Sequence, residues 1–354
     1  MAYSSISKPS LHFNTKLYTG NGSAGNAQTG IGFQPDFVWL KERGGTEYHN
    51  FYDVVRGTTK RLVSNLNSAE TTVSGLTSFG TDGFTVGAAD TANKNSSTYV
   101  AWNWKAGGGQ GSSNTDGSIN TTYTSANTTA GFSIIKYTGT GSNATVGHGL
   151  GVAPSFIIFK NLIASGGSAE HWVVYHKSVA PTKGIIFNLT NSADTDSAYF
   201  NNTAPTNSVF SLGSADKLNK SGQANIAYAF AEKKGYSKFG SYTSNNTAND
   251  GPFIYTGFKP AFVITKISSA SGTNWRIFDN KRDGFNGANQ HLQPNSSGAE
   301  SNDSPSQMDL LSNGFKLRGA EGDSNYNTET VIYMAFAKEP LVANVGESIP
   351  TTAV

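Results

Sequence analysis

Short apolar runs, separated by clusters of Gly, Asn and Ser, recur along the whole chain. Three of them begin two positions after a proline, at Phe37, Phe156 and Phe262. β-Branched and aromatic residues bounded by turn formers are typical of strands, and no stretch shows the 3.6-residue period of a long helix. The continuous apolar runs predict central strands covered on both faces, with proline tolerated at the strand start. The pattern therefore predicts an all-β protein.

The runs recur in the same order three times. The matched segments are an opening strand (13–20, 132–139 and 239–243), an aromatic strand (49–53, 172–176 and 275–279), a polar turn (from Asn65, Asn188 and Asn295), a strand after a turn (82–86, 208–212 and 313–317) and a closing strand (99–102, 225–228 and 333–336). Matches in the same order along the chain indicate three tandem copies of one unit.

We expect each copy to form one β-sandwich of jelly-roll type, because about 100 residues of short strands suit one sandwich. The predicted division is repeat 1 (1–107), a Gly/Ser/Thr-rich linker (108–129), repeat 2 (130–235), repeat 3 (236–340) and a C-terminal arm (341–354). The Gly-rich start of the linker is typical of a flexible spacer, and the alternative for its Thr/Ser-rich second half is an ordered edge strand. A flexible joint between complete units predicts that each unit folds alone.

Composition narrows the classes of function. Aromatic residues make up 12% of the chain, which is too many for a disordered protein. The net charge of +2 predicts no nucleic-acid partner. The absence of Cys excludes disulfides, thiolate metal sites and cysteine nucleophiles, and predicts folding in a reducing cytoplasm. We expect neither a signal peptide nor membrane insertion, because no apolar run has the length that either requires.

We find none of the common catalytic or phosphate-binding motifs, and expect a non-enzymatic protein with no catalytic residues and no cofactor. His171 and His176 are close in sequence, but we interpret them as flanking a strand and expect no metal site. Asp53 and Asp279 recur at strand ends. Paired carboxylates are the machinery of glycosidases, but the simpler interpretation is that these two accept hydrogen bonds from turn backbones.

Aromatic residues offer the candidate binding positions. Those that recur between copies are interpreted as core: Tyr18, Tyr137 and Tyr242, and Trp102, Tyr228 and Phe336. Three less regular ones, Trp104, Tyr48 and Tyr326, have Gly- or Asn-rich surroundings and are the candidate ligand-binding residues. Exposed rings beside amides suit sugars, because a ring stacks on the apolar sugar face while amides bond the hydroxyls.

Several segments carry a resemblance to a known group. They are 13–22, 31–41 with its Gly-Phe-x-Pro strand, 52–57 and 99–107. These segments resemble virion proteins of marine bacteriophages that are described as having concanavalin/laminin-G-like domains, and the similarity runs from about Ser4 to Pro340. It implies a protein of the tail or capsid surface but carries over no catalytic residue. Long fibres usually add an anchoring domain and a shaft, which this chain lacks, so a compact appendage or decoration protein is favoured.

The expected function is that of a virion structural protein, a tail appendage or adhesin that contacts the host envelope, with host-surface glycan as the candidate ligand. The alternative is a capsid decoration protein, and a third class is a polysaccharide depolymerase. The expected partners are other phage structural proteins of the tail or capsid, and the chain is expected to form a homo-oligomer. The expected location is the virion surface, after synthesis in the bacterial cytoplasm.

Overall fold

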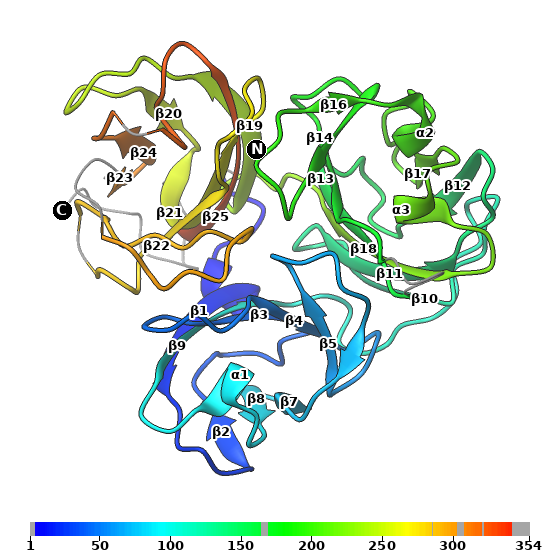
Figure 1. Cartoon of the computed structure of the whole chain (residues 1–354), viewed down its shortest axis with the longest axis horizontal. Helices are drawn as coiled ribbons and strands as arrows, with labels where there is room; N and C mark the ends of the chain where they lie inside the picture. Colours follow the sequence, from blue (N-terminus) through cyan, green and yellow to red (C-terminus); the bar gives the residue numbers. More distant parts are fainter. Residues whose placement is uncertain (1–3, 164–168, 285, 303–307, 321, 342–354) are drawn as a thin grey trace.

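The computed structural model describes residues 4–163, 169–284, 286–302, 308–320 and 322–341. Strands hold 41% of the chain and helices 5%, so the all-β prediction is confirmed. The chain forms three lobes around a common centre (Figure 1). We call them the first, second and third lobes; they contain β1–β9, β10–β18 and β19–β25, and every sheet is made of strands from one lobe.

Each lobe pairs a large sheet with a small one. The large sheet of the first lobe has the strand order β1 (Phe13–Thr19), β9 (Thr98–Trp104), β3 (Phe37–Glu42), β4 (Asn50–Asp53), β5 (Lys60–Val63) and β6 (Thr71–Thr72). Its small sheet has the order β2 (Asn26–Gln28), β8 (Gly83–Val86) and β7 (Leu76–Gly80). The lobe also contains the short helices η1 (Pro9–Leu11) and α1 (Asp90–Asn93). All strand pairs within these sheets are antiparallel.

The other two lobes follow the same plan. In the second lobe, the large sheet has the strand order β10 (Tyr123–Asn127), β11 (Phe132–Thr138), β18 (Ala224–Phe230), β13 (Phe156–Asn161), β14 (Val173–His176), β15 (Lys183–Ile186) and β16 (Asp194–Thr195). The small sheet pairs β12 (Ala144–Gly147) with β17 (Val209–Leu212), and the helices are α2 (Ser197–Phe200) and α3 (Asp216–Asn219). The third has a large sheet β19 (Ser237–Thr243), β25 (Thr330–Pro340), β21 (Phe258–Ile267), β22 (Arg276–Asp279) and a small sheet β20 (Phe253–Tyr255), β24 (Gly314–Leu317), β23 (Met308–Leu311).

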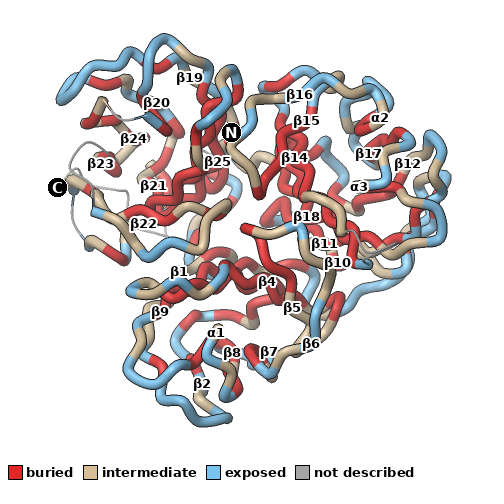
Figure 2. Tube along the Cα trace, viewed as in Figure 1, coloured by how far each residue is buried: buried red, intermediate tan, exposed pale blue. Residues whose placement is uncertain are grey.

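The large sheets are buried on both faces because two different cores flank them. In β3, Phe37 and Trp39 belong to a core at the centre of the molecule, whereas Val38 and Leu40 belong to a core inside the first lobe. This alternation follows from the two-residue period of a strand. The second and third lobes have inner cores of their own, and the central core takes side chains from all three lobes. Figure 2 shows the buried positions concentrated on the strands of the large sheets.

A closed ring of hydrogen bonds joins the lobes. The backbone N–H of Glu70 donates to the Leu162 carbonyl (2.9 Å). The backbone N–H of Ala193 donates to the Ser268 carbonyl (2.8 Å), and the N–H of Glu300 donates to the Arg43 carbonyl (2.7 Å). The first lobe therefore bonds the second, the second bonds the third, and the third bonds the first. This is the arrangement of a trimer with pseudo-threefold symmetry, built from one chain.

Side chains repeat the same ring at the ends of β4, β14 and β22. Asp53 Oδ2 accepts from the Tyr228 hydroxyl (2.8 Å), and Asp279 Oδ2 accepts from Trp102 Nε1 (3.0 Å). In the second lobe, His176 takes the place of the aspartate, and its Nε2 lies 3.1 Å from the Tyr333 carbonyl oxygen. Each strand end is thereby tied to a closing strand in the next lobe.

Two points of the sequence interpretation are refined. Within the predicted linker, residues Tyr123–Asn127 form the edge strand β10, which agrees with the second of the two alternatives for that segment. The predicted arm beyond Leu341 lies outside the described residues. The closing strand of the third copy was matched two residues out of register: Phe336 pairs with Phe262 as Trp104 pairs with Phe37, so Phe336 is the counterpart of Trp104 and not of Trp102.

Because His176 is buried, we expect the free energy of unfolding of the protein to be lower in mild acid than at neutral pH. Burial lowers the pKa of its imidazole to about 4, although the bond to the Tyr333 carbonyl opposes this shift. In the unfolded chain the imidazole titrates near pH 6.5. The stabilisation is therefore present above pH 6.5 and is lost as the pH falls towards 4, with a loss of about 3 kcal/mol.

The check is urea unfolding at pH 7.5 and pH 4 of the parent chain and of His176→Gln. We expect the parent to lose about 3 kcal/mol more than the variant between these two pH values, because the glutamine takes up no proton. Equal losses in both proteins would show that His176 does not carry the effect.

Candidate functional site

The recurring carboxylates are structural. Asp279 Oδ1 accepts from the backbone N–H groups of Lys281 (2.9 Å) and Arg282 (3.0 Å), and Asp53 Oδ1 accepts from the N–H of Arg56 (2.8 Å). This confirms the interpretation that they satisfy turn backbones. Each also holds the guanidinium three residues later, and both side chains of each pair are fully buried. These carboxylates are therefore not exposed to solvent.

Within the described part of the chain, no three His, Cys, Asp or Glu side chains are arranged to hold a metal ion, and no helix is long and apolar enough to cross a membrane.

The three sequence-predicted ligand residues do not form a site. Trp104 is 1% exposed and packs in the central core against Phe37 and Phe262, so its assignment as a surface residue that stacks on a ligand is wrong. Tyr48 (38% exposed) and Tyr326 (45% exposed) do reach solvent. They belong to different lobes, and neither lines either of the two clefts described below.

A different pair of aromatic rings stands on the surface of the third lobe. Phe253 and Tyr255 are 46% and 58% exposed, and Ile254 between them is buried in the core of that lobe. Because alternate residues of a strand share a face, both rings lie on the outer face of β20, which is an edge strand of its sheet. A Cβ at Gly314 would lie 2.0 Å from the Ile254 carbonyl oxygen and 3.1 Å from the Phe253 ring, so the glycine lets β20 and this ring pack closely on β24.

A cleft of about 240 Å³ opens beside Tyr255, where the second lobe meets the third. Polar groups line it, including Glu232, Lys238 and Thr256. Glu232 accepts from Lys238 Nζ (2.6 Å) and also from the ammonium of Lys177. Burial alone would raise the pKa of the Glu232 carboxyl, but the two lysines outweigh it and hold the pKa below its usual value. The carboxyl is therefore ionised at neutral pH. We call the two rings and this cleft the aromatic site.

The two exposed rings have no aromatic counterparts in the other two lobes. Ile254 faces Phe315 across the small sheet, as Gln28 faces Phe84 in the first lobe and Val146 faces Phe210 in the second. The counterparts of the two rings are therefore Ala27 and Thr29, and Thr145 and Gly147. A comparison of the copies in correct register is the signal that would have found this pair in the sequence.

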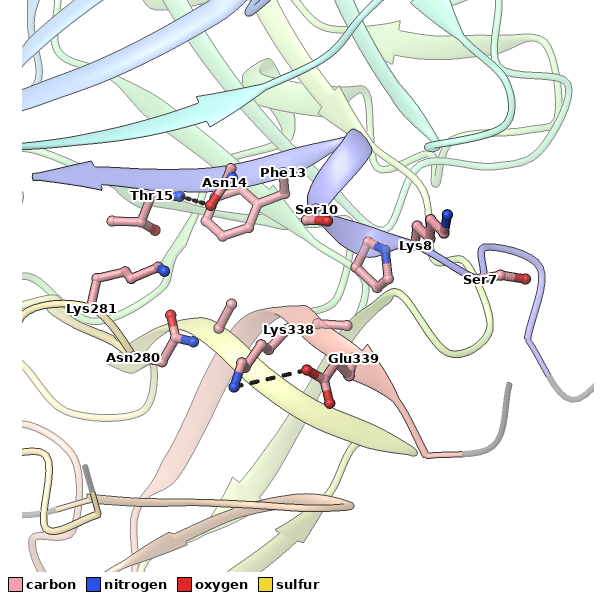
Figure 3. A pocket seen from close by; sticks show the side chains of 13 residues that line it. Ser7, Lys8, Ser10, Phe13, Asn14, Thr15, Asn280, Lys281, Lys338 and Glu339 are labelled. Atoms are coloured by element: carbon pink, nitrogen blue, oxygen red, sulfur yellow. Dashed lines mark hydrogen bonds and ion pairs between the residues drawn. The ribbon is translucent and has the colours of Figure 1, made fainter. Parts of the chain in front are cut away.

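A larger cleft, of about 560 Å³, lies between the first and third lobes (Figure 3). Phe13, Asn14 and Thr15 of β1 form one wall. Ala261, Lys281 and Lys338 of the third lobe belong to the opposite wall. We call this cleft the β1 groove. Its mixture of apolar, amide and ammonium groups fits a polar ligand or a peptide segment.

The fold therefore defines an all-β protein of three fused β-sandwich lobes with a central core, and both the aromatic site and the β1 groove lie at lobe junctions. Residues 8–340 match the family described as "Domain of unknown function (DUF7483)", and the chain belongs to that family. Comparison with curated proteins and with solved structures found no match.

Proposed function

We propose that the chain is a non-enzymatic surface protein of a bacteriophage particle that adheres to glycan on the host envelope. The observation that carries the binding role is the aromatic site. Phe253 and Tyr255 present two exposed rings from neighbouring positions on one face of a strand, and Tyr255 also lines a cleft that contains hydrogen-bonding groups. Rings of this kind stack on sugar faces, and the neighbouring polar groups bond hydroxyls. The virion role rests on the resemblance of the Gly-Phe-x-Pro strand and its flanking segments.

One site of this size favours weak binding, because a shallow cleft covers little of its ligand. Affinity then depends on several chains acting together, since linkage raises the effective concentration of each further site. A homo-oligomer of the chain on the particle would supply that multivalency.

The three-lobed ring favours a second candidate function, capsid decoration. A chain with internal pseudo-threefold symmetry presents three similar faces around one axis. Such a body suits a threefold position of a lattice, because equivalent loops meet equivalent partners there.

The test compares binding of the chain, clustered on beads, to host cells and to capsids from which it has been removed. The clustered parent chain should bind cells, and Phe253→Ala/Tyr255→Thr, which copies the first lobe, should bind at least tenfold less. Tyr326→Ala is the matched control, because it removes an exposed ring outside the aromatic site. Binding to capsids without binding to cells would contradict the adhesin function and support capsid decoration.

A further inference from the structure

The β1 groove runs beside a strand edge that has no partner within the described residues. β1 is the outermost strand of its sheet and pairs only with β9. At the end of this pair, Lys105 N, just after β9, donates to the His12 carbonyl, just before β1. The preceding residue, Trp104, points the opposite way: its carbonyl accepts from Asp36 N, on the side of β3. Residues alternate in an antiparallel pair, so Phe13, Thr15 and Leu17 direct their N–H and C=O groups away from β9.

The corresponding edge in the second lobe is covered. There β11 pairs with β18 on one side, as β1 pairs with β9, but on its other side it pairs with β10. β10 lies between β11 and the end of the first lobe: Asn127 Nδ2 donates to the Lys105 carbonyl, and Gly107 N donates to Ser125 Oγ. A strand thus fills the junction between the first and second lobes.

The β1 groove occupies the equivalent place at the junction between the third and first lobes. In the first lobe, Val54 N donates to the Asp36 carbonyl, and in the third lobe Asn280 N donates to the Ala261 carbonyl. Ala261 is therefore the counterpart of Asp36, and Lys281 is the counterpart of Val55. In the filled junction, Gly108 N bonds Asp36 Oδ2 and Gln110 Nε2 bonds the Val55 carbonyl. In the open junction, Ala261 and Lys281 line the groove instead.

The groove wall also contains an unsatisfied polar group. Thr15 is 8% exposed, and its Oγ1 has no hydrogen-bond partner among the described residues, while its N–H is covered only by its neighbour Asn14 Oδ1. A buried hydroxyl without a partner costs roughly 1–3 kcal/mol. A segment that lies along β1 would bring donors and acceptors to this position.

Charge defines the occupant further. Three lysines line the groove, Lys8, Lys281 and Lys338, against one glutamate, Glu339. The Lys338 ammonium lies 3.9 Å from the Glu339 carboxylate, and Lys281 extends into the space opposite Asn14 and Thr15 (Figure 3). A segment with acidic side chains complements this surface.

We propose that the β1 groove is a docking site for an extended, acidic segment of another protein, which adds a strand to the free edge of β1 as β10 is added to β11. Backbone hydrogen bonds to the edge supply affinity, and the lysines select for acidic side chains. The site lies between different lobes from the aromatic site, and the proposal does not depend on the proposed function.

The test uses fluorescent synthetic peptides of residues 121–128, which include β10, and the full chain. One peptide has the natural sequence, a second carries Ser125→Glu and Asn127→Asp, and a third carries Lys at both positions. Fluorescence anisotropy should show the acidic peptide binding at least tenfold more tightly than the lysine peptide, with a preference that weakens at high salt. The absence of binding by all three peptides at millimolar concentration would overturn the proposal.

Two variants of the chain locate the binding. Thr15→Pro removes the outward N–H without losing a bond to β9, so the fold should persist and peptide binding should fall at least tenfold. Lys281→Glu/Lys338→Glu should reverse the charge preference among the peptides, whereas the control Lys183→Glu, on an exposed position of the second lobe, should leave it unchanged. Unchanged binding in both groove variants, or binding of an acidic oligosaccharide such as hexagalacturonate in place of the peptides, would refute strand addition.

Discussion

A fragment that ends at Gly107 should fail to fold on its own. The first lobe contributes six aromatic side chains to the central core: Phe13, Phe37, Trp39, Phe51, Trp102 and Trp104. Without the other lobes these rings face water on the central side. Burial of one large side chain contributes roughly 1.5–3 kcal/mol, so six account for at most about 9–18 kcal/mol. That is as much as the whole stability of a typical domain, about 5–15 kcal/mol.

The expected result is the opposite of the independently folding units that the Gly-rich joint predicts. Circular dichroism and urea titration of the 1–107 fragment should show no cooperative transition. Co-expression with a 108–354 fragment is the matched control, because together they supply every contact of the central core and should form a soluble complex. A sharp unfolding transition of the 1–107 fragment alone would contradict the shared core.

Removal of the Asp279 carboxylate should cost about 3–5 kcal/mol of stability. Asp279 Oδ2 accepts from Arg282 Nε (2.6 Å) and from Trp102 Nε1 of the first lobe. Asp279→Ala leaves the buried guanidinium of Arg282 with only one ionic partner, Glu300 (3.0 Å), and a broken buried ion pair costs about this amount. The double variant Asp279→Leu/Arg282→Met removes both charges and should cost much less than the single one.

Denaturant titration of the parent, the single variant and the double variant measures these values. Equal losses in the two variants would show that the broken ion pair between Asp279 and Arg282 is not the cause. Acid gives a second readout. Burial tends to raise the pKa of the Asp279 carboxyl, but the Arg282 charge and the hydrogen bonds outweigh it, so the pKa is lowered. The contribution of Asp279 is therefore complete above the unfolded value near 3.9 and is lost as the pH falls through the lower folded value.

Much of the fold was predictable, because strand patterns are local. The run from Phe37 to Leu40 identified a strand buried on both faces, and the repeated order of runs identified three copies. The pattern did not reveal which partner covers each face, since a two-sided apolar strand looks the same under one sandwich or between two cores. The two-residue register error at Phe336 has a related cause: a shift of two keeps every side chain on its own face, so hydrophobicity does not detect it.

The site was harder to predict for the same reason. Trp104 precedes a Gly-rich segment, which favours a position at the surface, but its face of β9 points to the central core. Phe253 and Tyr255 belong to a short alternating strand whose exposed face depends on which sheet it joins. Local sequence identifies the alternation, and only the pairing of β20 with β24 decides that the rings face solvent.

Because the three lobes are parts of one chain, a substitution in one lobe is not repeated in the other two. In a trimer of identical chains, every substitution appears three times, so a change that helps at one position must be tolerated at all three. Here the residue tied across the lobe junction is Asp53 in one lobe, His176 in the next and Asp279 in the third, and each is coded separately. The ring can therefore keep a common architecture while one junction contains the β1 groove, another lies beside a pair of exposed rings and the third is filled by the strand β10.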